Sequence, residues 1–342
     1  MMAVDQPPQM AGETVYGEEI LRDELDRLDA YAVITSRTPW ALHAARLPKR
    51  PVAVVMSETL ERSELETISG QVPRGARIVG LGGGAVIDAA KYFAYLRGEG
   101  VMLAPTVSSS NGPFSDWISV RRNGRPDGFR DLDLPRRIVV DYALIERAQE
   151  RVNRAGYGDL LPLQTTLNDW RIAAAASRGT PVDAGIEAAA TELMRQAIAS
   201  AREIGALGRG GIERLMRLTE ASTALMLAHG DHPINAGSEH LFAWTLESLT
   251  GRHFLHGEIV ALGIVISSYL QQRDHSRLRT ALDEAGVMHR PAQLGLEWDE
   301  IERTLLCVGA YNREVRRYNT IYDDMEWTPA LLGELREVAY SH

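Results

Sequence analysis

Residues 77–91 read RIVGLGGGAVIDAAK, which predicts a buried strand, a turn of three glycines and the first turns of a helix. Gly82, Gly83 and Gly84 carry no side chain, so a ligand can approach their backbone closely. A helix that begins directly after them points unpaired N–H groups and the positive end of its dipole at the same place. We therefore interpret the turn as a site for an anion such as a diphosphate, with a plain tight turn as the alternative.

Apolar, β-branched runs alternate with amphipathic segments throughout the first part of the chain. This alternation predicts an α/β domain, with a Rossmann-like parallel sheet covered by helices on both faces. Ligands of such sheets bind beyond the carboxyl ends of the strands, where we expect the glycine turn and the serine-rich loop 105–112 to be neighbours. The expected strands are Tyr31–Thr35, Val52–Met56, Arg77–Leu81, Val101–Ala104 and Arg137–Val140.

Strand signals nearly vanish after residue 141, and the remaining segments are typical of helices. This change predicts a loose tail over residues 1–12, an α/β domain over 13–155 and an all-helical domain over 156–342. We expect the active site in the cleft between the two domains. The first expected helices of the second part are Ala143–Arg154, Leu160–Ser177, Pro181–Ile204, Gly211–His229 and Glu239–Leu249.

Composition narrows the function. The chain has 342 residues, of which 45% are hydrophobic and 24% charged, as expected of a soluble protein with two ordinary domains. Its net charge of -9 argues against nucleic acid or an anionic membrane as the main partner, although a small anionic substrate needs only a local positive pocket. No apolar run reaches the roughly 18 residues of a membrane span. The single cysteine, Cys307, predicts a reducing, cytoplasmic location.

Three polar residues stand out in the helical part: Asp159, His240 and His256. Two imidazoles and a carboxylate form a donor set for a divalent transition metal and leave room for a water or a substrate oxygen. Taken singly, each histidine is more often a surface or core residue than a ligand. Their spacing alone therefore gives a hypothesis of a metal site.

Six short motifs follow one another along nearly the whole chain. They are the glycine turn with Asp88 and Lys91; Pro105-Thr106 with Ser108–Gly112; Gly158–Leu161 with Asp169-Trp170; Gly237–Phe242; Leu255–Glu258; and Arg317–Ile321. In order, spacing and flanking residues they resemble the iron-containing alcohol dehydrogenase and dehydroquinate synthase superfamily. The likeness is greatest to its glycerol-1-phosphate dehydrogenase branch.

The resemblance implies a dinucleotide-binding domain over 13–155 and a metal- and substrate-binding domain over 156–342. It also implies that Asp159, His240 and His256 hold one divalent metal. We expect zinc, although iron, nickel and manganese accept the same donors. Such a metal polarises a carbonyl or acidifies a hydroxyl, while the nicotinamide of NAD or NADP gives or takes a hydride. The family also leads us to expect a homo-oligomer.

The resemblance also assigns cofactor contacts. The three glycines would hold the diphosphate, and Thr106 and Ser109 would donate hydroxyl hydrogen bonds near the diphosphate or the nicotinamide. Asp88 joins them as a cofactor-binding candidate, and its alternative is an ion pair with Lys91 at helical spacing. Glu58 closely follows the strand 52–56. A carboxylate there would bond a ribose hydroxyl and disfavour the extra phosphate of NADP.

Two kinds of chemistry divide the superfamily. Cyclases, which use NAD transiently to build a ring from a sugar phosphate, place a glutamate at the first metal ligand and carry a Gly-Gly-Lys stretch after the threonine-rich loop. This chain has Asp159 and lacks that stretch, which favours a dehydrogenase. A sugar-phosphate cyclase remains the alternative, and a catalytically silent binding or scaffold protein is a third reading.

The chain departs from the glycerol-1-phosphate dehydrogenase pattern around the substrate. Asn111 stands where the branch has an aspartate, so a charge and a proton acceptor are lost. Residues 231–236 replace an Arg-Pro-Ala-Ser segment, and Ala243 or Trp244 replaces a second histidine. These changes predict a small polyol or its ketone as the substrate. This compound is either phosphorylated, as in the glycerol-1-phosphate dehydrogenase branch, or a different polyol or ketone.

Four residues are the candidates for substrate binding and proton transfer. Asn111 is expected at the substrate, and His232 is a candidate proton relay. Arg316 and Arg317 are candidates for binding a phosphate, because guanidinium groups bind it in a bidentate manner. Their alternative role is that of solvated charges at a helix end.

Overall fold

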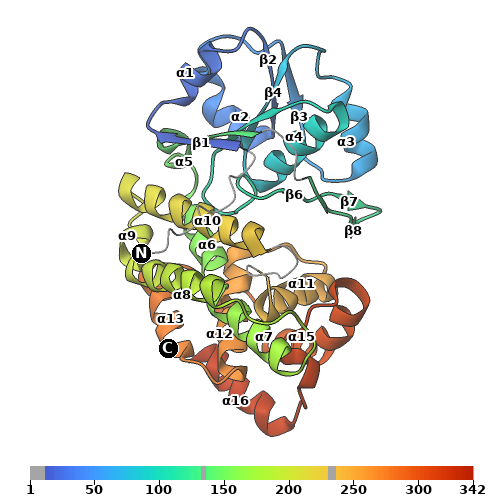
Figure 1. The fold of residues 1–342 in the computed structure, drawn as a ribbon, viewed down its shortest axis with the longest axis vertical. Helices are drawn as coiled ribbons and strands as arrows, with labels where there is room; N and C mark the ends of the chain where they lie inside the picture. Colours follow the sequence, from blue (N-terminus) through green and yellow to red (C-terminus); the bar gives the residue numbers. More distant parts are fainter. Residues whose placement is uncertain (1–11, 132–135, 230–235, 342) are drawn as a thin grey trace. The chain divides into compact units, whose positions relative to one another are not determined.

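Residues 12–131, 136–229 and 236–341 are described by the computed structural model. The chain divides into two units, Met1–Asn153 and Arg154–His342, and the division falls inside helix α6 (Glu150–Leu160). Among the described residues, the first unit contains all of the strands and the second only helices (Figure 1). The expected order of an α/β part followed by a helical part is confirmed.

Six strands of the first unit form one sheet in the order β1-β10-β5-β4-β2-β3, and every neighbouring pair is parallel. The strands are β1 (Gly12–Gly17), β2 (Tyr31–Thr35), β3 (Ala53–Met56), β4 (Arg77–Gly82), β5 (Val101–Pro105) and β10 (Arg136–Asp141). All five expected strands are confirmed. The assignment of Gly12 to a tail is wrong, because β1 begins there and pairs with β10. As an edge strand only partly buried, β1 lacks the run of buried apolar residues that marks β2, β4, β5 and β10.

The two faces of the sheet carry separate cores, because successive side chains of a strand point to opposite faces. On β2, Tyr31 and Val33 pack with α1 and α5, whereas Ala32 and Ile34 pack with α3 and α4. The helices and the 3-10 turn of this unit are α1 (Leu21–Asp26), α2 (Arg37–His43), η1 (Ala44–Arg46), α3 (Arg62–Ser69), α4 (Gly84–Arg97) and α5 (Tyr142–Ile145). Between β5 and β10, two short antiparallel ribbons pair β6 (Trp117–Ile118) with β9 (Phe129–Arg130) and β7 (Arg121–Arg122) with β8 (Arg125–Pro126).

The second unit packs its helices around α12, in which residues 259–266 are almost fully buried. Its further elements are α7 (Leu163–Ala175), α8 (Ala184–Ala199), α9 (Ala201–Gly205), α10 (Arg209–His229), α11 (Ser238–Thr250), α12 (His256–Leu270), α13 (His275–Glu284), α14 (Pro291–Leu294), α15 (Trp298–Tyr311), the π-helical turn η2 (Asn312–Arg316), the 3-10 turn η3 (Ile321–Asp324) and α16 (Pro329–Tyr340). No helix in the described ranges is both long and apolar enough to cross a bilayer.

The segment around Asp159 differs from the expectation. One helix was expected over 143–154 and another from Leu160, but the structure has α5, a break and then α6, which carries Asp159. Pro162 is the N-cap of α7, where the missing N–H of proline does no harm, so the helix restarts after it. The candidate ligand is therefore held on a helix near its carboxyl end.

Candidate active site

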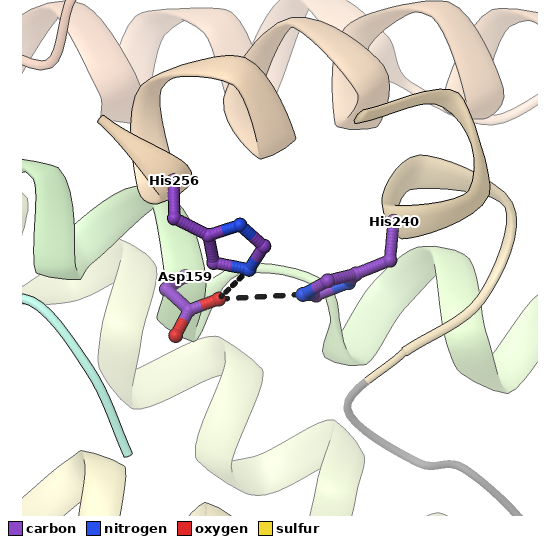
Figure 2. A group of neighbouring side chains, drawn as sticks. All are labelled: Asp159, His240 and His256. Carbon is purple, nitrogen blue, oxygen red and sulfur yellow. Dashed lines mark ion pairs between the residues drawn. The ribbon is translucent and has the colours of Figure 1, made fainter. Parts of the chain in front are cut away.

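Three side chains from three different helices of the second unit converge on one point (Figure 2). Asp159 lies on α6, His240 on α11 and His256 at the first residue of α12. Asp159 Oδ1 is 3.4 Å from His240 Nε2 and 3.5 Å from His256 Nε2. One donor atom from each residue lies within 4.8 Å of the other two. The structure thus brings together the three residues that the sequence suggested as metal ligands.

The helices α6 and α12 approach closely because two glycines face each other beside the ligands. A Cβ atom on Gly257 would lie 1.8 Å from the carbonyl oxygen of Ala155, and one on Gly158 would lie 2.1 Å from the carbonyl oxygen of Gly257. Any side chain at either position would therefore separate the helices. This contact holds Asp159 and His256, the neighbours of the two glycines in sequence, next to each other.

A third glycine places the remaining ligand. A Cβ atom on Gly263 of α12 would lie 2.5 Å from the carbonyl oxygen of Glu239 on α11. The backbone just before His240 therefore rests directly on α12. The sequence motifs contain Gly158 and Gly257, but only the packing shows that they set the spacing of the helices.

Glu239 fixes the orientation of the His240 ring. Its Oε1 atom lies 2.8 Å from His240 Nδ1 and accepts a hydrogen bond from the Gly237 N–H at 2.7 Å. The Thr165 hydroxyl donates to Oε2 at 2.6 Å, and the whole Glu239 side chain is buried. A carboxylate on Nδ1 keeps a proton on that nitrogen and leaves Nε2, which is directed at Asp159, as the nitrogen that would bind a metal, which is the arrangement that supports metal-binding histidines.

The donor set fits a divalent metal. Ligand atoms about 2.0–2.1 Å from a zinc ion in a tetrahedron lie about 3.3 Å apart, close to the two distances from Asp159 Oδ1. The side chains of Asp159 and His240 are 12% and 6% exposed, whereas that of His256 is 41% exposed. The site is therefore open on the side of His256, as expected of a site that must also accept a substrate oxygen.

The same geometry predicts proton release when metal binds. Burial alone lowers the pKa of His240, but its hydrogen bonds with Asp159 and Glu239 outweigh burial and raise this pKa to about 9. Desolvation by the surrounding helices lowers the pKa of His256 even though part of its side chain is exposed, so this ring is neutral near pH 7. In protein prepared without metal, His240 then carries a proton below pH 9 that a cation must displace. We expect one proton per zinc near pH 7, and binding that tightens about tenfold per pH unit toward pH 9.

Calorimetric titration with zinc in buffers of different ionisation enthalpy counts this proton directly. Metal binding competes with protonation of histidine between roughly pH 6.5 and 8.5. A zinc affinity that does not change over this range would contradict the assignment of His240 as a ligand.

A second prediction concerns Glu239. The change Glu239→Gln keeps the shape of the side chain and its contacts with Gly237 and Thr165 but removes the charge that orients His240. We expect zinc affinity to fall by about 10–100-fold while the fold persists. Competition with a chelator measures the affinity, and circular dichroism checks the fold. If the zinc affinity of Glu239→Gln equals that of the unchanged protein, the negative charge of Glu239 does not contribute to metal binding.

The glycine turn of the first unit has the form of a cradle. Gly82 ends β4, Gly83 is the N-cap of α4 and Gly84 is its first residue. A Cβ atom would lie 2.7 Å from Val86 at Gly82, 3.3 Å from Val107 at Gly83 and 3.1 Å from the Ser110 hydroxyl at Gly84. The turn therefore has no room for side chains, and its backbone lies against the loop that follows β5.

The two loops expected to be neighbours are neighbours. The Thr106 N–H donates to the carbonyl oxygen of Gly82 at 3.0 Å, and Thr106 is buried. Ser109 and Asn111 lie farther along the same loop, and both are half-buried. This part of the predicted cofactor site is thus assembled from two strand ends of one sheet.

Asp88 and Glu58 have partners within the protein. Asp88 forms an ion pair with Lys91 at 2.9 Å, and Lys91 Nζ also donates to the carbonyl oxygens of Gly112 and Trp117. This is the ion pair that the helical spacing suggested, and it anchors the loop beyond Asn111. The Glu58 carboxylate accepts a hydrogen bond from the Arg37 N–H at 2.9 Å at the start of α2.

The candidates for substrate contact are described only in part. His232 lies outside the described residues. Arg316 ends η2, and Arg317 follows it in the left-handed region with φ of 59°. The guanidinium carbon of Arg316 lies 4.0 Å from the centre of the Trp244 ring, and Trp244 lies 5.2 Å from the His240 ring. Trp244 thus links a candidate anion-binding residue to a candidate metal ligand.

Sequence reasoning missed Glu239, Trp244 and Asn312 as parts of the site. Glu239 directly precedes a candidate ligand, and this adjacency was the available signal. Trp244 lies one helical turn beyond His240, so the two share a face of α11. No local signal marks Asn312, whose side chain fixes the turn at Tyr318.

Comparison with known proteins shows the family to which this chain belongs. A family model described as iron-containing alcohol dehydrogenase matches residues 24–148. The glycerol-1-phosphate dehydrogenase (NAD(P)+) of Hyperthermus butylicus is 30% identical over 334 residues, which cover 91% of this chain and 90% of that protein. The protein of the same name from Sulfurisphaera tokodaii is 31% identical over 265 residues, covering 76% and 74%. The chain belongs to the iron-containing alcohol dehydrogenase superfamily, in its glycerol-1-phosphate dehydrogenase branch.

The superfamily predicted from the six motifs is therefore confirmed, as is a dehydrogenase in preference to a cyclase. This member of the iron-containing alcohol dehydrogenase superfamily also shares its fold with the crystal structure of a probable glycerol dehydrogenase from Sinorhizobium meliloti 1021. That comparison has a TM-score of 0.71 at 20% identity and covers 96% of each chain.

Proposed function

We propose that this chain interconverts a small polyol phosphate and its ketone, with NAD or NADP as the redox cofactor and a divalent metal ion. The observation that carries the proposal is the convergence of Asp159, His240 and His256 within 4.8 Å. A relative that matches 91% of this chain is a glycerol-1-phosphate dehydrogenase, which supports a three-carbon phosphate of this class as the substrate.

The three converging residues would hold the metal, and we propose zinc because it accepts two imidazoles and a carboxylate in a tetrahedron. A metal held there polarises a carbonyl or lowers the pKa of a hydroxyl, and the nicotinamide supplies or accepts the hydride. Glu239 keeps Nε2 of His240 aimed at Asp159. The exposed side of His256 leaves room for a substrate oxygen.

We assign residues 13–155 to cofactor binding and 156–342 to metal and substrate binding. The glycines Gly82–Gly84 would bind the diphosphate through their backbone at the start of α4. Thr106 and Ser109 lie on the adjoining loop and would donate hydroxyl hydrogen bonds. Because Asp88 is paired with Lys91, we propose that it acts by holding this loop in place.

Proton transfer is assigned by the chemistry of the candidates. The amide of Asn111 can orient a substrate by hydrogen bonds, but it does not take up a proton at neutral pH. We propose His232 as the proton relay, because an imidazole side chain can both take up and release a proton. The loss of an acid at Asn111 also supports a substrate that differs from glycerol-1-phosphate in its hydroxyl pattern.

The test is the absorbance of NADH or NADPH in the presence of zinc and dihydroxyacetone phosphate, with related keto polyols in parallel. Consumption of reduced cofactor that requires both the metal and a ketone supports the proposal. The ketone that is reduced most efficiently then identifies the substrate. Bound NAD without net consumption, together with ring formation from a sugar phosphate, would establish a cyclase and overturn it.

Two further proposals follow from the family and the composition. We propose a homo-oligomer, which sedimentation equilibrium of the purified protein tests. The single cysteine, Cys307, supports a reducing cytoplasmic location, which imaging of a tagged chain tests.

A further inference from the structure

A cavity of about 340 Å³ lies within the second unit, and its lining includes Gly237, which precedes the first residue of the helix that carries His240. The turn over residues 316–320 forms one wall, and Thr166 and Asp169 of α7 with Thr180 form another. Gly237, three residues before His240, completes the lining. One side of the cavity is thus formed by a residue that lies close in sequence to the candidate ligand His240.

Arg316 supplies positive charge to this cavity with unused hydrogen-bonding capacity. Its guanidinium lies over the Trp244 ring, with 4.0 Å between the guanidinium carbon and the ring centre. Its Nε atom is buried and has no hydrogen-bond partner among the described residues. A buried donor without a partner is unfavourable, and a bound acceptor would remove this cost. Stacking on an aromatic ring leaves the edges of the guanidinium free for in-plane hydrogen bonds.

The turn that carries Arg316 is held rigidly. The Asn312 side chain accepts from the Tyr318 N–H at 2.9 Å and donates to the Tyr318 carbonyl oxygen at 2.6 Å. Arg317, between them, takes the left-handed conformation that non-glycine residues rarely adopt. The Ile321 N–H donates to Asp169 Oδ1 at 2.9 Å and ties the far end of the turn to α7. A left-handed residue commonly ends a helical turn, and here it directs the chain from η2 into residues 318–320.

The acidic residue of the lining has its own hydrogen-bond partners. Asp169 accepts hydrogen bonds from the Ser238 and Ile321 N–H groups and from the Gln271 side chain, at 2.7–2.9 Å. These three donors occupy the carboxylate oxygens of Asp169, so the guanidinium of Arg316 keeps donors for a ligand. A phosphate offers the charge and the acceptor oxygens that these donors need, and arginine binds it in a bidentate manner.

We propose that this cavity binds the phosphate group of the substrate and that Arg316, stacked on Trp244, is the residue that recognises it. The proposal rests on the proposed function for the substrate and adds the residue that selects its anionic end. Trp244 acts as a positioning residue, because it sets the plane of the guanidinium beside His240.

Titration calorimetry with inorganic phosphate tests the site without any turnover. We expect the protein to bind phosphate and Arg316→Gln to weaken binding by about 10–100-fold, the range for a lost charged hydrogen bond. Arg316→Lys keeps the charge but loses the flat, forked geometry, so its affinity should lie in between. Arg313→Gln removes an exposed charge from the same turn and should bind like the unchanged protein. Equal binding by Arg316→Gln, or no phosphate binding by the unchanged protein, would overturn the proposal.

Kinetics separate the substrate from the cofactor as the source of the phosphate. Arg316→Gln should raise KM for dihydroxyacetone phosphate by a similar factor and leave KM for dihydroxyacetone unchanged. Inorganic phosphate should compete with the ketone phosphate. Competition with NADPH alone would assign the cavity to the cofactor and contradict the proposal. If no ketone is reduced, the proposed function fails, but the phosphate titration still decides the role of Arg316.

Discussion

Asp159→Asn is expected to lower the rate of ketone reduction by about 10³-fold or more, because a bound metal contributes several kcal/mol to such reactions. The change removes the charge to which both imidazoles are directed, at 3.4 and 3.5 Å. A neutral amide is a poor substitute for a carboxylate ligand. Steady-state consumption of NADH or NADPH measures the rate, and elemental analysis after dialysis measures the retained metal.

A matched change elsewhere in the same unit controls for the loss of a carboxylate as such. Asp183 caps α8 by accepting a hydrogen bond from the Ile186 N–H at 2.9 Å. Asparagine caps helices about as well, so Asp183→Asn should leave activity and metal content unchanged. Full activity and stoichiometric metal in Asp159→Asn would show that this carboxylate is no ligand.

Gly257→Ala is expected to disable the site by separating two helices. The new Cβ atom would lie 1.8 Å from the carbonyl oxygen of Ala155, and no side-chain rotation can relieve a clash between backbones. The helices α6 and α12 must move apart, at a cost at or above the usual 1–3 kcal/mol of overpacking. Because a shift of about 1 Å at reacting groups costs about 100-fold in rate, we expect lower thermal stability together with weaker zinc binding and slower turnover.

The exposed glycine of α16 provides the control. A Cβ atom on Gly333 meets nothing within 4 Å, so Gly333→Ala should stabilise the helix by up to about 1 kcal/mol and leave zinc binding unchanged. Thermal melts and chelator competition compare the two variants. Zinc affinity of Gly257→Ala equal to that of the unchanged protein would show that the glycine contact does not set the ligand spacing.

Most of the α/β part could be predicted because its four inner strands, β10, β5, β4 and β2, are largely buried on both faces and contain apolar runs. The edge strand β3 was recognised as well, since Ala53–Met56 is an apolar run although it is only partly buried. The exception is β1, an edge strand whose short apolar segment lies between two glycines. Helix limits near Asp159 were also misplaced, because the break before α6 depends on packing as well as on local propensity.

The sequence could suggest Asp159, His240 and His256 as metal ligands, but it could not show that the three side chains lie close together in the folded chain. Asp159 is separated from His240 by α7–α10, so no periodicity relates them. What brings them together is the close approach of α6, α11 and α12 at Gly158, Gly257 and Gly263. A glycine in a sequence shows that close approach is allowed, but not which segment approaches.

The family, the parallel sheet with its glycine turn, and the types of residue that carry the chemistry could all be inferred from the sequence. These features depend on local patterns and on short motifs in a fixed order. The folded chain was needed to show that Glu239 orients His240, that Asp88 is paired with Lys91, and that Arg316 lies over Trp244. The charge and hydrogen bonding of a side chain are set by its neighbours in space, and folding brings most of these neighbours from distant parts of the chain.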